Sequence, residues 1–383
     1  MNIGIFTDTY FPQISGVATS IQTLKNSLEN LGHSVFIFTT TDPKVSSNDS
    51  EPNVFRFGSV PFISFTDRRV VYRGLFHATE IAKELKLDIV HTQTEFSMGW
   101  IGKYVAKSLK IPVIHTYHTM YEDYLHYVLN GHLLKPVHVK RFTRAFLHHT
   151  KGVVAPSLRV KTTLESYGVK QPIEIIPTGI ELNNLNDSVN DSLREELGLQ
   201  SDTPVILTLS RISMEKKISR ILEAMPKLTD SIKGLVLIVA GDGPDLKTLQ
   251  NEAKDLGVAD SVKFIGAVSH EKVGSYYRMA DLFVSASDTE AQGLTYIEAM
   301  ATGTKCVVFS GEYTDRLFNT PEYGRTFTDH EEMYQEIVNY LQEGPGKIKP
   351  EFLEDKLEEI SADTFGEKIE KFYQTVIADY QLS

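Results

Sequence analysis

Two glutamates, Glu290 and Glu298, stand with seven residues between them in the segment ASDTEAQGLTYIEAMATG. An apolar run at 281–285 precedes them and predicts a buried strand, and the segment after Gly293 predicts a helix. Glu298 would then lie about one turn into that helix, roughly 7 Å along its axis, where its carboxylate could accept both hydroxyls of a ribose. Glu290 would stay in the loop above the strand end, where ligands of open α/β sheets bind. The segment therefore suits a nucleotide joined to a second polyhydroxyl group.

The expected helix start comprises Gly293, Leu294 and Thr295. Free backbone N–H groups at a helix start are suited to holding phosphates. The alternative is that the two glutamates serve as a partner of the helix dipole and as part of a solvated face.

Two cations, Arg211 and Lys216, follow the apolar run 205–209 in the segment LTLSRISMEKKISR. At the carboxyl edge of a sheet they could clamp a diphosphate, Arg by its fork and Lys as a point charge. When a sugar–phosphate bond breaks, negative charge grows on the leaving diphosphate, so fixed cations stabilise the transition state more than the ground state. A solvated cluster of charges is the alternative.

Together these residues resemble the family 4 glycosyltransferases, retaining enzymes of the two-domain GT-B fold, which carry R-x4-K and E-x7-E in their C-terminal domain. Here the motifs read Arg211 to Lys216 and Glu290 to Glu298. The resemblance continues in AGDGP at 240–244 and PTGI at 177–180 and covers essentially the whole chain. It implies a UDP-sugar-dependent hexosyltransferase in which Glu298 binds the ribose and Glu290 binds hydroxyls of the donor sugar.

In the N-terminal half, the loop FTDTYFPQISGV leads into a helix expected to begin near Val17. Gly16 permits close backbone approach, and the N–H groups beside it could touch the donor phosphate. Members of the family often have two glycines in this loop, whereas here the first is Ser15. A loop glycine that serves only the turn is the alternative.

The segment HTYHTMYEDY supplies His118, which matches the family position whose imidazole faces the donor sugar near the reacting carbon. A neutral imidazole there can accept or donate a hydrogen bond to a sugar hydroxyl. His115 is expected only to pack. The remaining polar residues around it are expected on the acceptor side, namely Thr92, Gln93, Thr94, Glu95, Tyr117, Tyr121, Glu122, Asp123 and Tyr124.

The resemblance implies transfer with retention of configuration. A double displacement needs a carboxylate nucleophile beneath the anomeric carbon, and the resemblance assigns Glu298 to the ribose and Glu290 to sugar hydroxyls. We therefore expect front-face substitution, in which the leaving phosphate oxygen takes the proton of the acceptor hydroxyl and domain closure excludes water. No D-x-D stands at a strand end, so we expect no metal and no cofactor besides the UDP-sugar.

Alternating apolar runs and helical patterns predict an α/β chain of 383 residues in which a doubly wound, Rossmann-like unit occurs twice. The expected domains are 1–180, for the acceptor, and 193–360, for the nucleotide sugar, with the polar stretch 182–192 between them and a cleft between the domains. A final helix, 363–383, is expected to complete the first domain.

The charge divides unevenly, because residues 1–175 carry a net +5 and the remainder a net −16. The strongest basic cluster, HLLKPVHVKRFTRAFLHHT, interleaves Lys135, Lys140, Arg141 and Arg144 with apolar residues. From Pro136 onward it reads as a basic amphipathic helix, which is typical of a membrane-surface element. A helix packed on its own domain with a solvated basic edge is the alternative. Nucleic acid is not an expected partner.

No run of 18 apolar residues, no secretory signal and a single cysteine, Cys306, favour a cytoplasmic location. The basic amphipathic helix of a cytoplasmic protein would attach it peripherally to the inner membrane face. Within the family, the runs FTDTYFPQISGVATSI, HTQTEFS and HTYHTMYEDY resemble the bacterial diacylglycerol α-glucosyltransferases. That resemblance implies UDP-glucose as donor, 1,2-diacylglycerol as acceptor and α-monoglucosyldiacylglycerol as product. A relative that uses UDP-galactose, another glycolipid, phosphatidylinositol or a soluble acceptor remains open, as does a non-catalytic nucleotide-sugar sensor.

Overall fold

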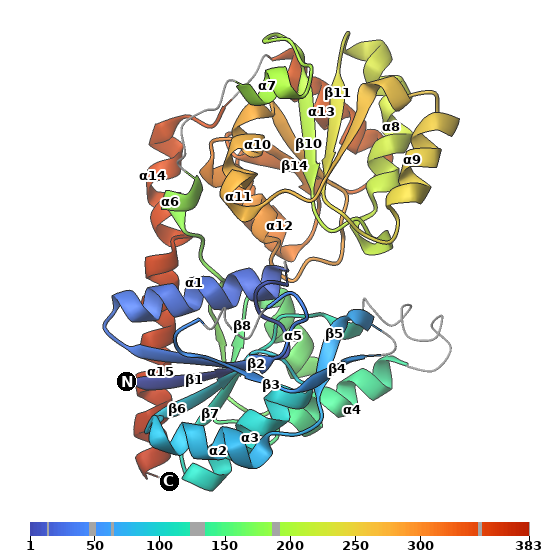
Figure 1. Ribbon diagram of the computed structural model, residues 1–383. Coiled ribbons are helices and arrows are strands. Elements are labelled where there is room, and N and C mark those ends of the chain that lie inside the picture. The colour runs from blue at the N-terminus through green and yellow to red at the C-terminus, as the bar shows by residue number, and fades with distance from the viewer. Residues whose placement is uncertain are drawn as a thin grey trace. The chain divides into compact units, whose positions relative to one another are not determined.

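The computed structural model describes residues 1–13, 15–45, 51–62, 65–122, 135–185, 192–343 and 347–382. The chain divides into two compact units, of which the first comprises Met1–Gly179 with Ala362–Ser383 and the second Ile180–Ser361 (Figure 1). The boundary falls just before the polar stretch 182–192, most of which lies outside the described residues. Each unit is an α/β layer structure, as the alternating pattern predicted.

The first unit is built on a parallel sheet of seven strands within its described residues, in the order β3-β2-β1-β6-β7-β8-β9. An antiparallel hairpin, β4-β5, which the sequence did not predict, follows β3. The strands are β1 (Asn2–Phe6), β2 (Ser34–Thr40), β3 (Val54–Phe57), β4 (Ser59–Phe62), β5 (Phe65–Val71), β6 (Ile89–Thr92), β7 (Val113–Thr116), β8 (Gly152–Ala155) and β9 (Ile173–Ile175).

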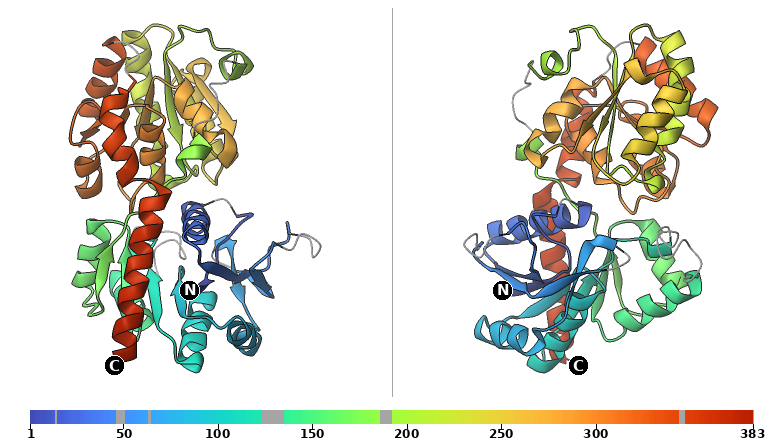
Figure 2. Two further views of the ribbon diagram at one scale, coloured as in Figure 1. Left: turned by 90° about the vertical axis from the view of Figure 1, so that its left-hand side faces the viewer. Right: turned by 45° about the vertical axis from the view of Figure 1, so that its right-hand side comes forward.

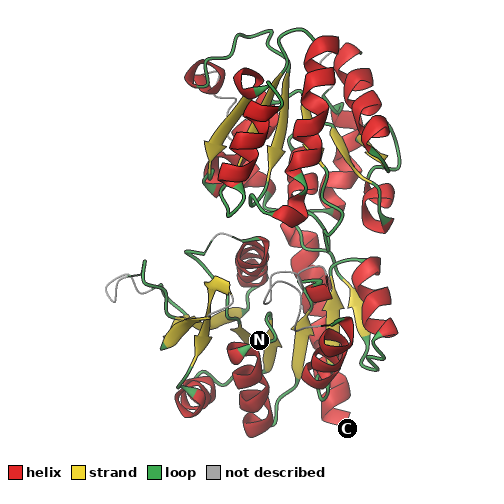
Figure 3. Ribbon diagram, turned by 90° about the vertical axis from the view of Figure 1, so that its right-hand side faces the viewer, coloured by secondary structure: helices red, strands yellow, loops and turns green. Residues whose placement is uncertain are grey.

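Helices cover both faces of this sheet (Figure 3). Alternate residues of β1 separate the two cores: Ile3 and Ile5 pack toward α1 and α15, whereas Phe6 packs toward α2 and α3. The helices of the unit are α1 (Gly16–Asn30), α2 (Leu75–Glu84), α3 (Ser97–Leu109), α4 (Pro136–Leu147), α5 (Leu158–Ser166) and α15 (Ala362–Leu382).

The last helix, α15, lies beside α1 and completes the core of the first unit (Figure 2). Its apolar residues, among them Ile369 and Phe372, pack on the sheet, and Phe372 comes so close to β8 that only glycine fits at Gly152. Hydrogen bonds add specificity to this packing. The Tyr373 hydroxyl lies 2.6 Å from Nδ1 of His91, and Nε2 of the same ring lies 2.7 Å from the Thr116 hydroxyl. Burial lowers the pKa of His91 well below its usual value, so the ring is neutral.

The second unit has a parallel sheet of six strands within its described residues, in the order β12-β11-β10-β13-β14-β15. The strands are β10 (Val205–Leu209), β11 (Val236–Ala240), β12 (Val262–Gly266), β13 (Leu282–Ser285), β14 (Cys306–Phe309) and β15 (Gly324–Phe327). The helices are α6 (Leu182–Leu185), α7 (Ser192–Glu196), α8 (Ile218–Ser231), α9 (Leu246–Asp255), α10 (Val273–Met279), α11 (Leu294–Ala301), α12 (Glu312–Leu317), α13 (His330–Gln342) and α14 (Pro350–Glu359). Both faces are covered by apolar cores, which explains the near-continuous apolar runs in these strands.

Each sheet has a point where the strand order reverses, between β1 and β6 in the first unit and between β10 and β13 in the second. Ligands of open α/β sheets bind at the carboxyl ends of the strands beside such a point. Arg211 and Lys216 follow β10, and Glu290 and Glu298 follow β13. The topology therefore brings the two motifs to one crevice of the second unit.

Removing the Tyr373 hydroxyl tests how α15 is held. In Tyr373→Phe, a buried nitrogen of His91 loses its partner, so the free energy of unfolding should fall by about 1–3 kcal/mol. Urea denaturation measures this change. Tyr104→Phe is the control, because Tyr104 is an exposed tyrosine of α3 and its substitution should change stability by less than about 0.5 kcal/mol. Equal stability of the two variants would contradict a stabilising role for the His91 bond.

Candidate functional site

The helix start after β13 requires a glycine. Gly293 precedes α11 with a φ of +73°, and a Cβ there would lie 2.6 Å from two ring carbons of Tyr296. The N-cap is this glycine, which has no capping side chain. The Tyr296 N–H donates to the Gly293 carbonyl at 3.0 Å, which leaves the N–H groups of Leu294 and Thr295 to other partners. Leu294 and Thr295 are the first two residues of α11 and are partly exposed.

Glu298 is the most unusual carboxylate of the second unit. It lies in the middle of α11 and is 7% exposed. The Tyr277 hydroxyl donates a 3.0 Å hydrogen bond to its Oε2, while Oε1 has no hydrogen-bond partner among the described residues. Burial raises the pKa of Glu298 to about 7, and the Tyr277 bond opposes this rise only in part. A hydrogen bond from a ligand would therefore stabilise the charged form of Glu298.

Two neighbouring lysines join the loops on either side of the strand-order reversal. Lys216 Nζ lies 2.5 Å from Glu290 Oε1, and Lys217 pairs with Asp288. The structure thus brings Lys216 of the first motif to Glu290 of the second, as their positions on adjacent strands require. Arg211 is exposed on the same β10 loop.

The glycines of the AGDGP segment support the loop that carries Arg211. A Cβ at Gly241 would lie 1.8 Å from the Ser210 carbonyl oxygen, and one at Gly243 would lie 2.1 Å from the Ile212 carbonyl oxygen. The Ile212 N–H also donates to the Asp242 carbonyl at 2.9 Å. Any side chain at either glycine would displace this backbone, so the segment serves to position the β10 loop.

In the first unit, α1 begins at Gly16, one residue before the expected start, and Ser15 is its N-cap. Ser15 has an extended backbone with φ −159°, and its hydroxyl accepts from the Ala18 N–H at 3.2 Å. This position needs a capping side chain and no positive φ, which explains how serine replaces the glycine common in the family.

His118 follows β7 and lies beside Gln93, which follows β6. Its Nε2 is 2.6 Å from the Gln93 side-chain oxygen. Burial, together with the nearby charge of His115, lowers the pKa of His118 to about 3. The imidazole is therefore neutral at physiological pH.

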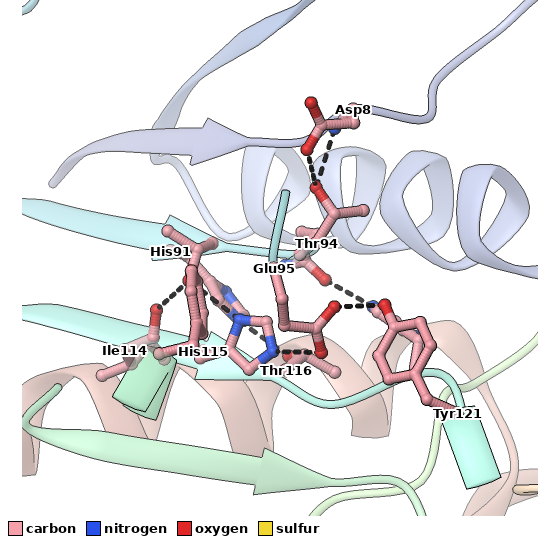
Figure 4. Close-up of polar contacts among 12 residues, drawn as sticks. Asp8, His91, Thr94, Glu95, Ile114, His115, Thr116 and Tyr121 are labelled. Atoms are coloured by element: carbon pink, nitrogen blue, oxygen red, sulfur yellow. Dashed lines mark hydrogen bonds and ion pairs between the residues drawn. The ribbon is translucent and has the colours of Figure 1, made fainter. Parts of the chain in front are cut away.

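Two buried carboxylates, Asp8 and Glu95, are satisfied by neighbours within the unit (Figure 4). Asp8 accepts from the Thr94 hydroxyl at 2.7 Å, from the Met98 N–H at 3.0 Å and from a serine hydroxyl of α3. Glu95 accepts from the Tyr121 hydroxyl and lies 3.0 Å from His115 Nε2. Both carboxylates therefore serve the scaffold.

The acceptor-side expectation accordingly changes for four residues. The side chains of Thr94 and Glu95 form the internal bonds just described, and Tyr117 is fully buried. Thr92 is also fully buried, and its hydroxyl donates to the Ile114 carbonyl at 3.1 Å. These residues frame the site but do not line it. Asp123 and Tyr124 lie outside the described residues.

The basic segment forms α4, beginning at Pro136 as expected. Lys135, Arg141 and Arg144 are exposed, whereas Lys140 is partly buried and donates to the Ser166 carbonyl at 2.9 Å. Part of the basic cluster is thus tied to its own unit.

Apolar side chains accompany these cations. Val137 and Phe142 of α4 are exposed, and so are Trp100 and Tyr104, one turn apart on α3. The rings of Trp100 and Phe146 meet edge to face with centroids 5.3 Å apart, which joins the two helices. We call the exposed side chains of Trp100, Tyr104, Lys107, Lys135, Val137, Arg141, Phe142 and Arg144 the α3–α4 surface.

Sequence reasoning missed several residues that position the site. Tyr277, Lys217 and Asp288 belong to no motif, and their roles depend on contacts across 21 and 71 residues of chain. Trp100 and Tyr104 had a signal, the i, i+4 spacing of two aromatic residues on one helix face.

No helix in the described part of the chain has the length and apolarity needed to span a bilayer.

The raised pKa of Glu298 predicts a pH-dependent gain in stability for Glu298→Gln. The folded protein binds the Glu298 proton more tightly than the unfolded chain, so wild-type stability falls as pH rises from 4.5 through 7. Glutamine still accepts the Tyr277 bond and carries no charge. Relative to wild type, the variant should therefore gain about 2–3 kcal/mol between pH 5 and pH 8.

Urea denaturation at both pH values measures this difference. Glu354→Gln, an exposed glutamate in the middle of α14, is the control and should show no comparable change. A pH-independent difference for Glu298→Gln would contradict the raised pKa.

Comparisons with known proteins identify the family of the chain. Residues 14–184 match the model of Glycosyltransferase Family 4, and residues 189–351 match that of Glycosyl transferases group 1. The alpha-monoglucosyldiacylglycerol synthase of Streptococcus pneumoniae is 46% identical over 98% of this chain and 86% of its own length. The protein of the same name from Acholeplasma laidlawii is 34% identical over 89% of this chain and 88% of its own length.

Solved structures share the fold over nearly the whole chain. Sucrose-phosphate synthase of Thermosynechococcus elongatus has a TM-score of 0.78 at 20% identity and 99% coverage of both chains. Anabaena HepE in complex with UDP-glucose has a TM-score of 0.76 at 17% identity, with 98% of this chain and 100% of the other covered. The family models, the 46% identical relative and the two Rossmann-like sheets together establish that the chain belongs to the family 4 glycosyltransferases and is a hexosyltransferase of the GT-B fold.

Proposed function

We propose that the enzyme transfers glucose from UDP-glucose to the hydroxyl of 1,2-diacylglycerol, giving α-monoglucosyldiacylglycerol with retention of configuration. The observation that carries this proposal is the convergence of Lys216, Glu290 and Glu298 at the strand-order reversal of the second unit. Two relatives that align with most of the chain are named alpha-monoglucosyldiacylglycerol synthase, which supports the choice of product.

In the donor site, each group has a role that its environment suits. Glu298 Oε1, which has no described partner, accepts the ribose hydroxyls. The N–H groups of Gly293, Leu294 and Thr295 at the start of α11 bind phosphate oxygens. Glu290 accepts hydroxyls of the sugar and, by its contact with Lys216, keeps that ammonium group at the same edge of the sheet.

The charge of the leaving diphosphate is met by Arg211 and Lys216, so we propose that the reaction needs no metal. Cations already held in place stabilise growing negative charge without reorganisation in the transition state. Neither Glu290 nor Glu298 is assigned as a nucleophile, and the acceptor hydroxyl attacks from the face that UDP leaves. The leaving phosphate oxygen takes the hydroxyl proton as the new glycosidic bond forms. In the first unit, Gly16 at the start of α1 and His118 are the proposed substrate contacts.

The proposed acceptor is a membrane lipid. We propose that the α3–α4 surface docks on the cytoplasmic face of the membrane. It combines the exposed cations Arg141 and Arg144 with Trp100 and Phe142. Aromatic rings favour the bilayer interface, and basic side chains attract anionic lipids. The buried Cys306 fits a reducing compartment.

Transfer of radiolabelled sugar into vesicles that contain diacylglycerol tests the proposal, with UDP-glucose and UDP-galactose compared and EDTA present. Label from UDP-glucose in a single-sugar lipid is the expected result. Transfer only from UDP-galactose would show that the proposed donor is wrong. Transfer only to another glycolipid, phosphatidylinositol or a soluble acceptor would show that the proposed acceptor is wrong. UDP binding without any turnover would favour a nucleotide-sugar sensor.

Two adjacent lysines give a matched test of the donor site. Lys216→Met removes a cation from the diphosphate clamp and should lower kcat/KM at least about 100-fold without unfolding the protein. Lys217→Met removes an equal charge and an equivalent ion pair with Asp288 and should retain activity within a few fold. Steady-state kinetics and circular dichroism measure both variants. An equal loss of kcat/KM in both variants would contradict a role of Lys216 in binding the diphosphate, because it would show that both ion pairs act only through loop structure.

The docking surface makes a second prediction. Arg141→Gln with Arg144→Gln should weaken binding to anionic vesicles about 30-fold at low salt, because each basic residue contributes about 1 kcal/mol, while UDP binding stays unchanged. Lys83→Gln with Lys86→Gln, at the end of α2, is the control with the same loss of charge. Vesicle sedimentation measures binding. An equal effect of the two double variants would indicate dependence on net charge alone and contradict a docking site on α4.

A further inference from the structure

Gln93 is 2% exposed, and one half of its side chain has no partner. Its oxygen lies 2.6 Å from His118 Nε2, whereas its Nε2 group is buried without a hydrogen bond to any described residue. A buried amide whose donors are unsatisfied lowers the stability of the fold. A residue kept at this cost calls for an explanation other than stability.

The bond from His118 has a consequence for its ring. Because the Gln93 oxygen can only accept, His118 Nε2 must carry the proton, and Nδ1 must then carry the lone pair of the neutral ring. Nδ1 has no hydrogen-bond partner among the described residues, and the His118 side chain is partly exposed. The ring thus offers an acceptor, and no donor, toward solvent or substrate.

The surroundings hold this pair in place. The Gln93 N–H donates to the Phe6 carbonyl at 2.9 Å, which joins the loop after β6 to the end of β1. His115, which starts the segment that leads to His118, is fixed by Thr92 at 2.9 Å and by Glu95 at 3.0 Å. Both partners of the pair therefore stand on a rigid edge of the sheet beside the strand-order reversal.

We propose that Gln93 is the positioning residue of His118: it fixes the tautomer in which Nδ1 accepts a hydrogen bond from a substrate hydroxyl. This inference rests on the proposed function and adds to it the direction of the hydrogen bond. The hydroxyl belongs either to the donor sugar or to the lipid acceptor, and a partner that lacks a hydroxyl hydrogen is not recognised.

Histidine-selective ¹⁵N NMR of the full chain tests the tautomer without substrate. The His118 signals, assigned by their loss in His118→Asn, should show a protonated Nε2 and an unprotonated Nδ1. In Gln93→Met, whose side chain has a similar length and no acceptor oxygen, both tautomers should be populated. A protonated Nδ1 in the wild type, or an unchanged tautomer in Gln93→Met, would overturn the proposal. Because no turnover is involved, these outcomes are independent of donor and acceptor identity.

Stability and kinetics separate positioning from a structural role. Gln93→Met removes a buried unsatisfied amide and should leave stability equal or higher, while kcat/KM falls roughly tenfold through the misdirected ring. The control, Tyr121→Phe, breaks the neighbouring bond to Glu95 and should lower stability without changing the His118 tautomer. A stable Gln93→Met variant with unchanged kcat/KM would also overturn the proposal.

Two further measurements on Gln93→Met identify the source of the hydroxyl: the rate of UDP-glucose hydrolysis and the KM for diacylglycerol. A parallel fall in UDP-glucose hydrolysis without acceptor assigns the hydroxyl to the donor sugar. Unchanged hydrolysis with a raised KM for diacylglycerol assigns it to the acceptor. If neither the hydrolysis rate nor the KM changes, contact between Nδ1 and a substrate is contradicted.

Discussion

The parallel sheet with one reversal of strand order is the constraint on which the rest depends. It requires the loops after β10 and β13 to meet at one edge, although 74 residues separate Lys216 from Glu290. The same constraint in the first unit brings the loop after β1 beside the loop after β6. Each unit therefore has one edge at which short loops on rigid strands present polar groups, and the chemistry follows from which groups those loops carry.

Buried carboxylates distinguish the scaffold from the site. Asp8 accepts from three donors, and Glu95 is held by a tyrosine and a histidine, so their burial is compensated within the fold. Glu298 is also buried but has one donor among the described residues, and burial raises its pKa. Gln93 shows the same contrast with an uncharged group. Incomplete compensation at the edge of a sheet makes Glu298 and Gln93 candidates for contact with a ligand.

Much of the fold could be predicted from the sequence because buried parallel strands read as apolar runs, and the GT-B architecture of two Rossmann-like sheets is confirmed. Strand β3, the hairpin β4–β5 and strand β15 were missed because their short, partly polar segments, such as VFRF and GRTF, lack that signal. The positions of Glu290 and Lys216 followed from motif order, whereas the roles of Tyr277 and Gln93 did not. Their contacts join distant segments, and no local pattern records which side chains will meet in three dimensions.

The most direct test of the account is the anomeric configuration of the glycolipid made from UDP-glucose and diacylglycerol. The proposed front-face substitution, in which Arg211 and Lys216 would hold the leaving diphosphate, preserves the α configuration of the donor. The proton NMR spectrum of the purified product should therefore show an α-glucosyl group. A β-glucosyl product would contradict retention and, with it, the roles assigned to Glu290, Glu298 and the cation clamp.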